Sequence, residues 1–249
     1  MGGRADYDVL SRVYDAGRAM PEEWVAEWRS ALTPYLGGMT GHVTDVGSGT
    51  GIWAAFIAKW FYVSVIGIEP STGMRERAGM DRKDPRIAYV GGEAEHLPLS
   101  DGSCTALWMS TVVHHVPNLE AAAHEARRVL QDDAPVLIRQ GFSGRLEGVL
   151  WTRFFPSALK LAEQRQITVE SVIETFAMAG FKYENLEPVT EIAAIDLQAY
   201  AKKTATRADS CLAAIPDDEF EVGLEALRRA ASDADIAPVT ATLDLLVLR

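Results

Sequence analysis

The segment 43–51, VTDVGSGTG, restricts the fold more than any other part of the sequence. It combines an apolar run that ends at Val46, an acidic residue, Asp45, and three glycines. Because an apolar, helix-like run begins at Ile52, the segment predicts a strand, a glycine turn and a helix in that order. Glycines let a ligand approach the backbone closely, and the helix offers unpaired N–H groups at its first turn. The segment therefore predicts a ligand-binding turn of an α/β fold.

The spacing of the glycines distinguishes between classes of ligand. A dinucleotide-binding turn has the pattern Gly-x-Gly-x-x-Gly, whereas Gly51 comes one residue early and Ile52 takes the expected place. A phosphate-binding P-loop needs a Lys-Ser or Lys-Thr pair after the glycines, and no such pair follows. Asp45, before the first glycine, would repel a pyrophosphate and suits a cationic ligand better.

A second acidic residue follows the next predicted strand. The run 63–68, VSVIGI, is apolar, and Glu69 comes directly after it. This position is about twenty residues beyond the first glycines, where a carboxylate accepts hydrogen bonds from ribose hydroxyls. The sequence therefore predicts a ribose-bearing ligand with a positive charge.

These residues resemble the motifs of a known family. Asp45-x-Gly47-x-Gly49-x-Gly51 followed by Glu69 resembles the class I S-adenosylmethionine-dependent methyltransferases. The resemblance covers roughly residues 7–181 and, weakly, the closing strand. Further segments follow the order of motifs in the small-molecule branch of that family: Glu93-Ala94-Glu95, Leu97-Pro98, Asp101-Gly102, His114-His115-Val116 and Arg128-Val129-Leu130. Cys104-Thr105 and the segment 131–134 depart from the family pattern, and neither touches the glycine turn.

The resemblance implies S-adenosyl-L-methionine as the cofactor and S-adenosyl-L-homocysteine as its product. It implies cofactor contacts from the N-terminal cap, the glycine turn and the following strand ends: Tyr14, Arg18, Asp45, Gly47, Ser48, Gly49, Gly51, Glu69, Pro70, Met74, Glu93, Ala94, Glu95 and Ser110. For Tyr14 and Arg18 a second interpretation has equal weight, namely a packing residue and a solvated helix charge. Glu95 is alternatively a solvated side chain.

Strands and helices are expected to alternate between residues 41 and 140, which is typical of a parallel sheet covered on both faces. The resemblance implies a Rossmann-like α/β fold with a seven-stranded, mostly parallel sheet whose final strand is antiparallel. Ligands bind such sheets at the carboxyl ends of the strands. Strands are expected near 42–46, 63–68, 86–90, 104–110, 134–140, 183–192 and 239–248, and helices near 51–60, 72–80, 118–130, 169–179, 197–207 and 218–231.

The chain of 249 residues is interpreted as a single methyltransferase domain, long enough to bury a substantial core. Trp151, Phe154 and Phe155 either line an apolar pocket or, the weightier alternative, belong to the core. The expected parts are a helical cap (1–40, with helices over 7–19 and 21–36), a cofactor-binding core (41–140), a substrate-covering insertion (141–180) and the C-terminal part of the sheet (181–249).

Charge and cysteine content limit the partners and the location. The formal net charge of -11 argues against nucleic acid, whose affinity for proteins comes largely from Lys and Arg. Cys104 and Cys211 lack metal-site spacing, so no metal is expected, and they favour a reducing, cytoplasmic location.

The N-terminal segment lacks the apolar core of a signal peptide. The apolar stretch 52–68 is interrupted by Lys59, so no membrane span is expected. The oligomeric state is left open.

Methyl transfer from a sulfonium is an in-line displacement, for which positioning supplies much of the rate. A base is needed only where the acceptor must lose a proton. His114 and His115 are the candidates, because imidazole titrates near neutral pH and the pair follows the predicted strand end at Ser110. Successive helical side chains diverge by about 100°, so one of them, preferably His114, is expected to face the pocket. The weightier alternative is that both are structural.

The sequence thus predicts an enzyme that transfers a methyl group from S-adenosylmethionine to a small molecule. Two alternatives stay open, an NAD-dependent oxidoreductase and an S-adenosylmethionine-binding protein with a non-methylating role. The acceptor, and whether its O, N or C atom is methylated, are not determined by the sequence.

Overall fold

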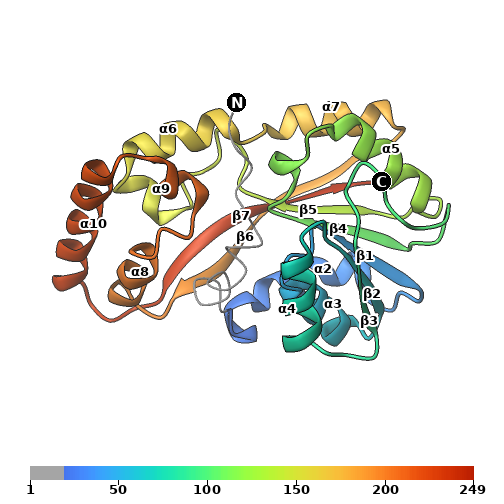
Figure 1. Cartoon of the computed structure of the whole chain (residues 1–249), viewed down its shortest axis with the longest axis horizontal. Coiled ribbons are helices and arrows are strands. Elements are labelled where there is room, and N and C mark those ends of the chain that lie inside the picture. Colours follow the sequence, from blue (N-terminus) through green and yellow to red (C-terminus); the bar gives the residue numbers. More distant parts are fainter. Residues whose placement is uncertain (1–19) are drawn as a thin grey trace.

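The structure is a computed structural model that describes residues 20–249 (Figure 1). Seven strands form one sheet in the order β3-β2-β1-β4-β5-β7-β6. The pairs among β1 to β5 are parallel, and β7 runs antiparallel to both β5 and β6. The strands are β1 (His42–Val46), β2 (Ser64–Ile68), β3 (Ile87–Val90), β4 (Ala106–Ser110), β5 (Val136–Gln140), β6 (Tyr183–Ala194) and β7 (Val239–Leu248). The expected seven-stranded, mostly parallel sheet with an antiparallel final strand is confirmed.

Helices cover both faces of this sheet, with α5 and α7 on one face and η1, α2 and α3 on the other (Figure 1). The first expected helix, 7–19, lies outside the described residues. The helices are η1 (Glu22–Val25), α2 (Ala26–Leu36), α3 (Ile52–Phe61), α4 (Thr72–Asp81), η2 (Val113–His115), α5 (Leu119–Val129), η3 (Leu150–Arg153), α6 (Pro156–Arg165), α7 (Val169–Met178), α8 (Leu197–Thr204), α9 (Ser210–Ala214) and α10 (Asp217–Ser232). No helix within residues 20–249 is long and apolar enough to cross a membrane.

The sheet separates two apolar cores because successive residues of a strand point to opposite faces. In β4, Leu107 and Met109 join the core under α5 and α7, whereas Trp108 joins the core under α2 and α3. All three side chains are buried. This two-sided burial explains why the strands are continuous apolar runs in the sequence.

The core under α2 and α3 also contains a buried ion pair. Arg139 of β5 donates from Nη2 to both carboxylate oxygens of Glu191 in β6, at 2.5 and 2.6 Å. Trp28 of α2 donates from Nε1 to the same carboxylate at 2.7 Å. The guanidinium lies 5.2 and 5.0 Å from the ring centroids of Trp28 and Trp53, within the range of cation–π attraction. The ion pair therefore fastens α2 and α3 to the carboxyl end of β5.

A helical lobe lies at one end of the sheet, where the long strands β6 and β7 extend beyond their neighbours (Figure 1). It contains η3, α6, α8, α9 and α10, which share two small apolar clusters. Phe155 is buried there and stacks on Phe220 with ring centroids 5.5 Å apart. Trp151 and Phe154 pack against the same clusters. These aromatic side chains therefore form the core of the lobe, whereas α7 packs on the sheet through Phe176.

The buried ion pair leads to a test of stability. Arg139→Met leaves the Glu191 carboxylate buried without its charge partner, so we expect the free energy of unfolding to fall by about 3–5 kcal/mol. The double variant Arg139→Met/Glu191→Leu should lose less than the sum of the two single variants, because it leaves no unpaired charge. Denaturant unfolding measures each value. In the exposed pair Arg249–Glu184, Arg249→Met is the control and should cost at most about 1 kcal/mol. Additive losses for Arg139 and Glu191 would contradict this expectation.

Candidate functional site

The glycine turn joins β1 to α3 in the conformation that the sequence predicts. Gly47, Gly49 and Gly51 have φ angles of +71°, +54° and +80°. A Cβ atom at Gly47 would lie 2.4 Å from Cγ2 of Val112, and one at Gly51 would lie 2.2 Å from the hydroxyl of Tyr89. A Cβ at Gly49 would meet nothing within 4 Å. Two of the glycines thus permit close packing, while the middle one borders open space.

Asp45 lies at the end of β1 and is 1% exposed. The backbone N–H of Ala54 donates to its carboxylate, while Oδ2 is buried with no hydrogen-bond partner among the described residues. Burial, and then the nearby charge of Glu69, raise the pKa of Asp45 to about 7. The hydroxyl of Ser48 in the turn also lacks a partner in this part of the chain. A buried carboxylate oxygen without a partner is costly unless something else pairs with it.

Glu69 follows β2, and backbone groups orient its carboxylate. Oε2 accepts a hydrogen bond from the N–H of Gly49 at 3.0 Å, and Oε1 accepts one from Ser71 at 2.8 Å. The N–H groups of Gly47 and Ser48 donate to the carbonyl of Ile68 at 2.8 and 3.1 Å. The structure therefore brings the glycine turn and Glu69 together.

The remaining predicted cofactor residues differ in exposure. Pro70 is exposed, whereas Met74 is buried in α4, whose cap Ser71 accepts from the Met74 N–H at 3.2 Å. After β3, the Glu93 side chain is exposed and Ala94 packs against the core under α5 and α7.

Of three further predicted cofactor positions, the structure describes only one, Glu95. Glu95 accepts a hydrogen bond from the N–H of Asn118 at 3.2 Å, so it helps to order the start of α5 rather than being only a solvated side chain. Tyr14 and Arg18 lie outside the described residues.

The end of β4 turns sharply toward the glycine turn. Ser110 accepts a hydrogen bond from Nη1 of Arg139 at 3.3 Å. The next residue, Thr111, has a φ of +51°, and its N–H donates to the carbonyl of Arg139 at 2.7 Å. A β-branched residue rarely adopts this conformation, and such strain is often found at functional sites. The turn directs the chain into η2.

The two predicted catalytic histidines lie in η2, with ring centroids 3.9 Å apart. His114 is half-buried and His115 is exposed. Nδ1 of His114 lies 3.0 Å from Nε2 of Gln140, a buried side chain that also contacts Gln166. The sequence interpretation missed both glutamines. The signal available for Gln140 was a polar residue at the end of the apolar run of β5.

The site lies where the strand order reverses, between β1 and β4. Asp45, Glu69, Ser110 and His114 all follow or end strands at this carboxyl edge, which is the expected ligand position in such sheets. No group of three potential metal-binding side chains gathers in the described part of the chain.

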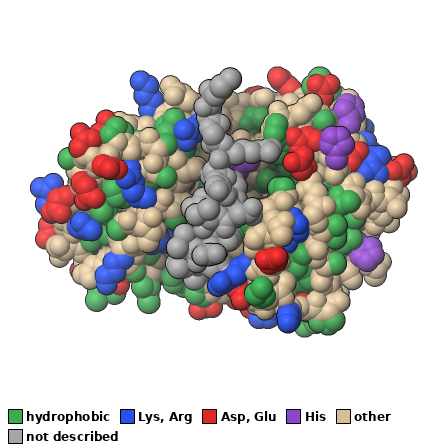
Figure 2. Space-filling view, in the orientation of Figure 1, with side chains coloured by type: hydrophobic (Ala, Val, Ile, Leu, Met, Phe, Trp, Pro, Cys, Tyr) green, Lys and Arg blue, Asp and Glu red, His purple; other side chains and the backbone are tan. Residues whose placement is uncertain are grey.

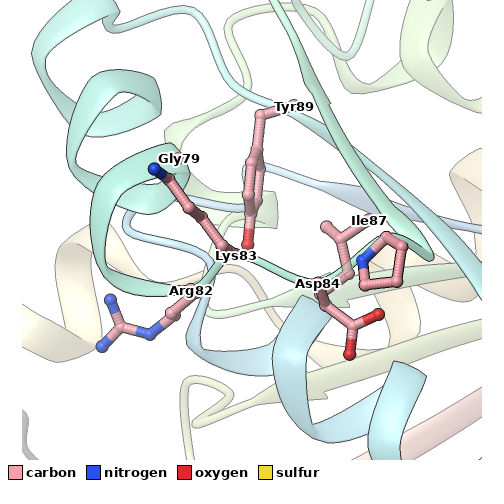
Figure 3. Close-up of a pocket in the computed structure, with 7 residues that line it drawn as sticks. Gly79, Arg82, Lys83, Asp84, Ile87 and Tyr89 are labelled. Atoms are coloured by element: carbon pink, nitrogen blue, oxygen red, sulfur yellow. The ribbon is translucent and has the colours of Figure 1, made fainter.

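A cavity of about 340 Å³ lies beside the turn. Figure 3 shows the side chain of Tyr89 entering it from β3. Arg82, which also lines it, donates to the carbonyl of Thr50 at 2.8 Å. This cavity is therefore next to the turn, outside the edge that holds Asp45 and His114.

The raised pKa of Asp45 predicts a pH-dependent stability. Between pH 4 and pH 7 the Asp45 carboxyl binds its proton more tightly in the folded state than in the unfolded chain. Its contribution to the free energy of unfolding is therefore complete below about pH 4 and is lost as pH rises through 7. The side chain introduced by Asp45→Asn cannot ionise. The free energy of unfolding of this variant, minus that of the wild type, should therefore increase by on the order of 2–4 kcal/mol between pH 4 and pH 8.

Denaturant unfolding of both proteins from pH 4 to pH 8 measures this difference. Asp218→Asn, on the exposed first turn of α10, is the control and should show no such change. A difference between wild type and Asp45→Asn that is constant over the range would contradict the assignment.

Comparisons with known proteins agree with this geometry. Residues 44–138 match the family model of a methyltransferase domain. The ubiquinone/menaquinone biosynthesis C-methyltransferase UbiE of Methylobacterium nodulans is 37% identical over 131 residues, which cover 50% of this chain and 50% of that protein. The chain spans about half the length of the curated relatives it matches.

Solved structures show the same fold over most of the chain. A putative methyltransferase from an antibiotic biosynthesis pathway of Anabaena variabilis has a TM-score of 0.75 at 20% identity, covering 92% of this chain and 100% of that one. Phosphoethanolamine N-methyltransferase 2 of Haemonchus contortus, in complex with S-adenosyl-L-methionine, has a TM-score of 0.63 at 19% identity, covering 98% of this chain and 58% of that one. The segment from β1 to β5 thus matches a methyltransferase domain, within a fold that the chain shares with these solved structures.

Proposed function

We propose that this protein transfers a methyl group from S-adenosyl-L-methionine to a small-molecule acceptor. The observation that carries the proposal is the placement of two buried carboxylates, Asp45 and Glu69, on either side of the glycine turn. Negative charge favours a cationic ligand and opposes a pyrophosphate, and carboxylate oxygens accept hydrogen bonds from ribose hydroxyls.

The residues of the site fit this cofactor in three respects. Oδ2 of Asp45 is a buried acceptor without a partner in residues 20–249, and it is suited to a cationic group. Gly49 borders open space where a side chain would otherwise stand. Glu69 is held in one orientation by two backbone N–H groups, as a carboxylate that binds ribose requires. When bound, S-adenosylmethionine supplies the methyl group on its sulfonium.

The protein's own contribution is mainly orientation. Holding two reacting atoms in line at near-attack distance accounts for a large part of the barrier reduction in such reactions. Ser110 and His114 lie at the same strand edge, beyond the glycine turn, and we assign the acceptor to this side. The helical lobe, which includes part of the predicted insertion 141–180, is proposed to cover it. The lobe's surface bears acidic and basic side chains interspersed (Figure 2), which favours a small molecule over a phosphate backbone.

The two alternative functions predict different ligands. A dinucleotide would place its pyrophosphate at the turn beside Asp45, and the charges would repel. A protein that binds S-adenosylmethionine without methylating would bind the cofactor and yield no S-adenosylhomocysteine. A cytoplasmic location stays a prediction, supported by two cysteines that are free and buried.

Cofactor binding is tested first by isothermal titration with S-adenosylhomocysteine and with NAD. We expect binding of S-adenosylhomocysteine, and Glu69→Gln should weaken it by on the order of 10- to 100-fold, since a hydrogen bond to a charged group is lost. Glu76→Gln, an exposed change on α4, is the matched control and should bind normally. Binding of NAD without binding of S-adenosylhomocysteine would overturn the proposal.

Methyl transfer is tested with methyl-labelled S-adenosylmethionine and a panel of phenols, carboxylic acids, 1,3-diketones and amines. We expect S-adenosylhomocysteine and a labelled product with at least one member. Cofactor binding together with an absence of transfer to every member would instead favour the non-methylating role.

A further inference from the structure

Arg75 of α4 fastens the segment that carries the Glu69 carboxylate. Its Nη1 donates to the carbonyl of Glu69 at 2.6 Å and to that of Pro70 at 2.9 Å. Its Nη2 donates to Oγ1 of Thr72 at 2.9 Å. A guanidinium presents its donors in a rigid, planar fork, so one side chain can fix two carbonyl groups at once. These bonds therefore hold the turn between β2 and α4 in one conformation.

The same guanidinium is packed against the end of the neighbouring strand. Gly91 follows β3, and a Cβ atom at this position would lie 3.2 Å from Cζ of Arg75. The ends of β2 and β3 are also joined by the N–H of Glu69, which donates to the carbonyl of Val90 at 3.1 Å. The predicted cofactor residues 93–94 follow two positions after Gly91. Arg75 thus lies between two strand ends that carry predicted cofactor residues.

One peptide unit connects Arg75 to the carboxylate of Glu69. The carbonyl of Pro70 accepts a hydrogen bond from Arg75. The N–H of the same peptide unit belongs to Ser71 and donates to Oε1 of Glu69 at 2.8 Å. Because a peptide unit is planar, fixing its carbonyl also fixes the direction of its N–H. Arg75 therefore orients the donor that in turn orients the carboxylate.

We propose that Arg75 is a positioning residue for the cofactor, which holds the Glu69 carboxylate ready for the ribose hydroxyls through the peptide between Pro70 and Ser71. This role rests on the proposed function, because it requires that Glu69 binds the ribose of S-adenosylmethionine. A carboxylate that is already held in its bound orientation loses little conformational freedom when the ligand arrives, and this raises the affinity. The effect of Arg75 on the cofactor is thus exerted through Glu69.

Isothermal titration with S-adenosylhomocysteine measures the effect of Arg75→Met, which keeps a long side chain and removes its donors. We expect the dissociation constant to rise on the order of tenfold, the cost of ordering a free side chain and its loop on binding. Arg75→Lys keeps a donor for the carbonyls without the planar fork and should recover part of that loss. Arg228→Met, an exposed change in α10, is the matched control and should bind as the wild type does.

The ribose hydroxyls distinguish an effect through Glu69 from a general loss of structure. The 2′,3′-dideoxy analogue of S-adenosylhomocysteine offers Glu69 no hydroxyl, so Arg75→Met should weaken its binding by less than about twofold, the usual limit for uncoupled changes. A loss as large as that for S-adenosylhomocysteine would overturn the proposal.

A double variant tests the same connection within the protein. Because Arg75 acts through Glu69, the loss of affinity for S-adenosylhomocysteine in Arg75→Met/Glu69→Gln should be smaller than the product of the two single losses. Losses that multiply fully would assign the effect of Arg75 to another group and would contradict its positioning role.

Denaturant unfolding without ligand shows whether each variant is folded. If Arg75→Met does not fold, Arg75→Gln takes its place, because its shorter amide retains a donor but cannot form the fork. Normal binding by the folded variant, beside a wild type that binds S-adenosylhomocysteine, would overturn this inference and leave the proposed function intact. A wild type that binds no S-adenosylhomocysteine would overturn the proposed function and, with it, the role of Arg75.

Discussion

The backbone hydrogen bonds that fasten the glycine turn to the end of β2 are the constraint on which the site depends. The carbonyl of Ile68 accepts from Gly47 and Ser48, and the next residue, Glu69, accepts from Gly49. The turn can come this close only because its glycines lack side chains where Val112 and Tyr89 stand. The two carboxylates are thereby held within range of each other's charge. Burial raises the pKa of Asp45, and the nearby charge of Glu69 raises it further.

Local sequence patterns were sufficient for the sheet and for the glycine turn with its neighbour Glu69. Alternating apolar runs, the glycine spacing and the acidic residue after the second strand are short-range signals, and they located β1, β2 and Glu69 closely. The short helix α9 and the helix α6 were missed. Their apolar residues serve the small core of the lobe, and the sequence alone did not show that this core exists.

The contacts around Arg139 and Gln140 could not be predicted in the same way because they join distant parts of the chain. Arg139 pairs with Glu191 across β7, which itself is contributed by the end of the chain. Gln140 meets His114 and Gln166, each from a different loop. None of these residues belongs to a spacing motif that includes its partner. His114 became a candidate because it stands in a motif, whereas no motif marks its contact with Gln140.

Arg139 and Gln140 are neighbours on one strand, and their side chains leave opposite faces of the sheet. Arg139 lies against the tryptophans of the core beneath α2. Gln140 contacts His114 and Gln166, the residue that follows α6. Two adjacent residues thus make their contacts on opposite faces of the sheet. A substitution at Arg139 changes the contacts beneath α2, whereas a substitution at Gln140 changes the contacts with His114 and Gln166.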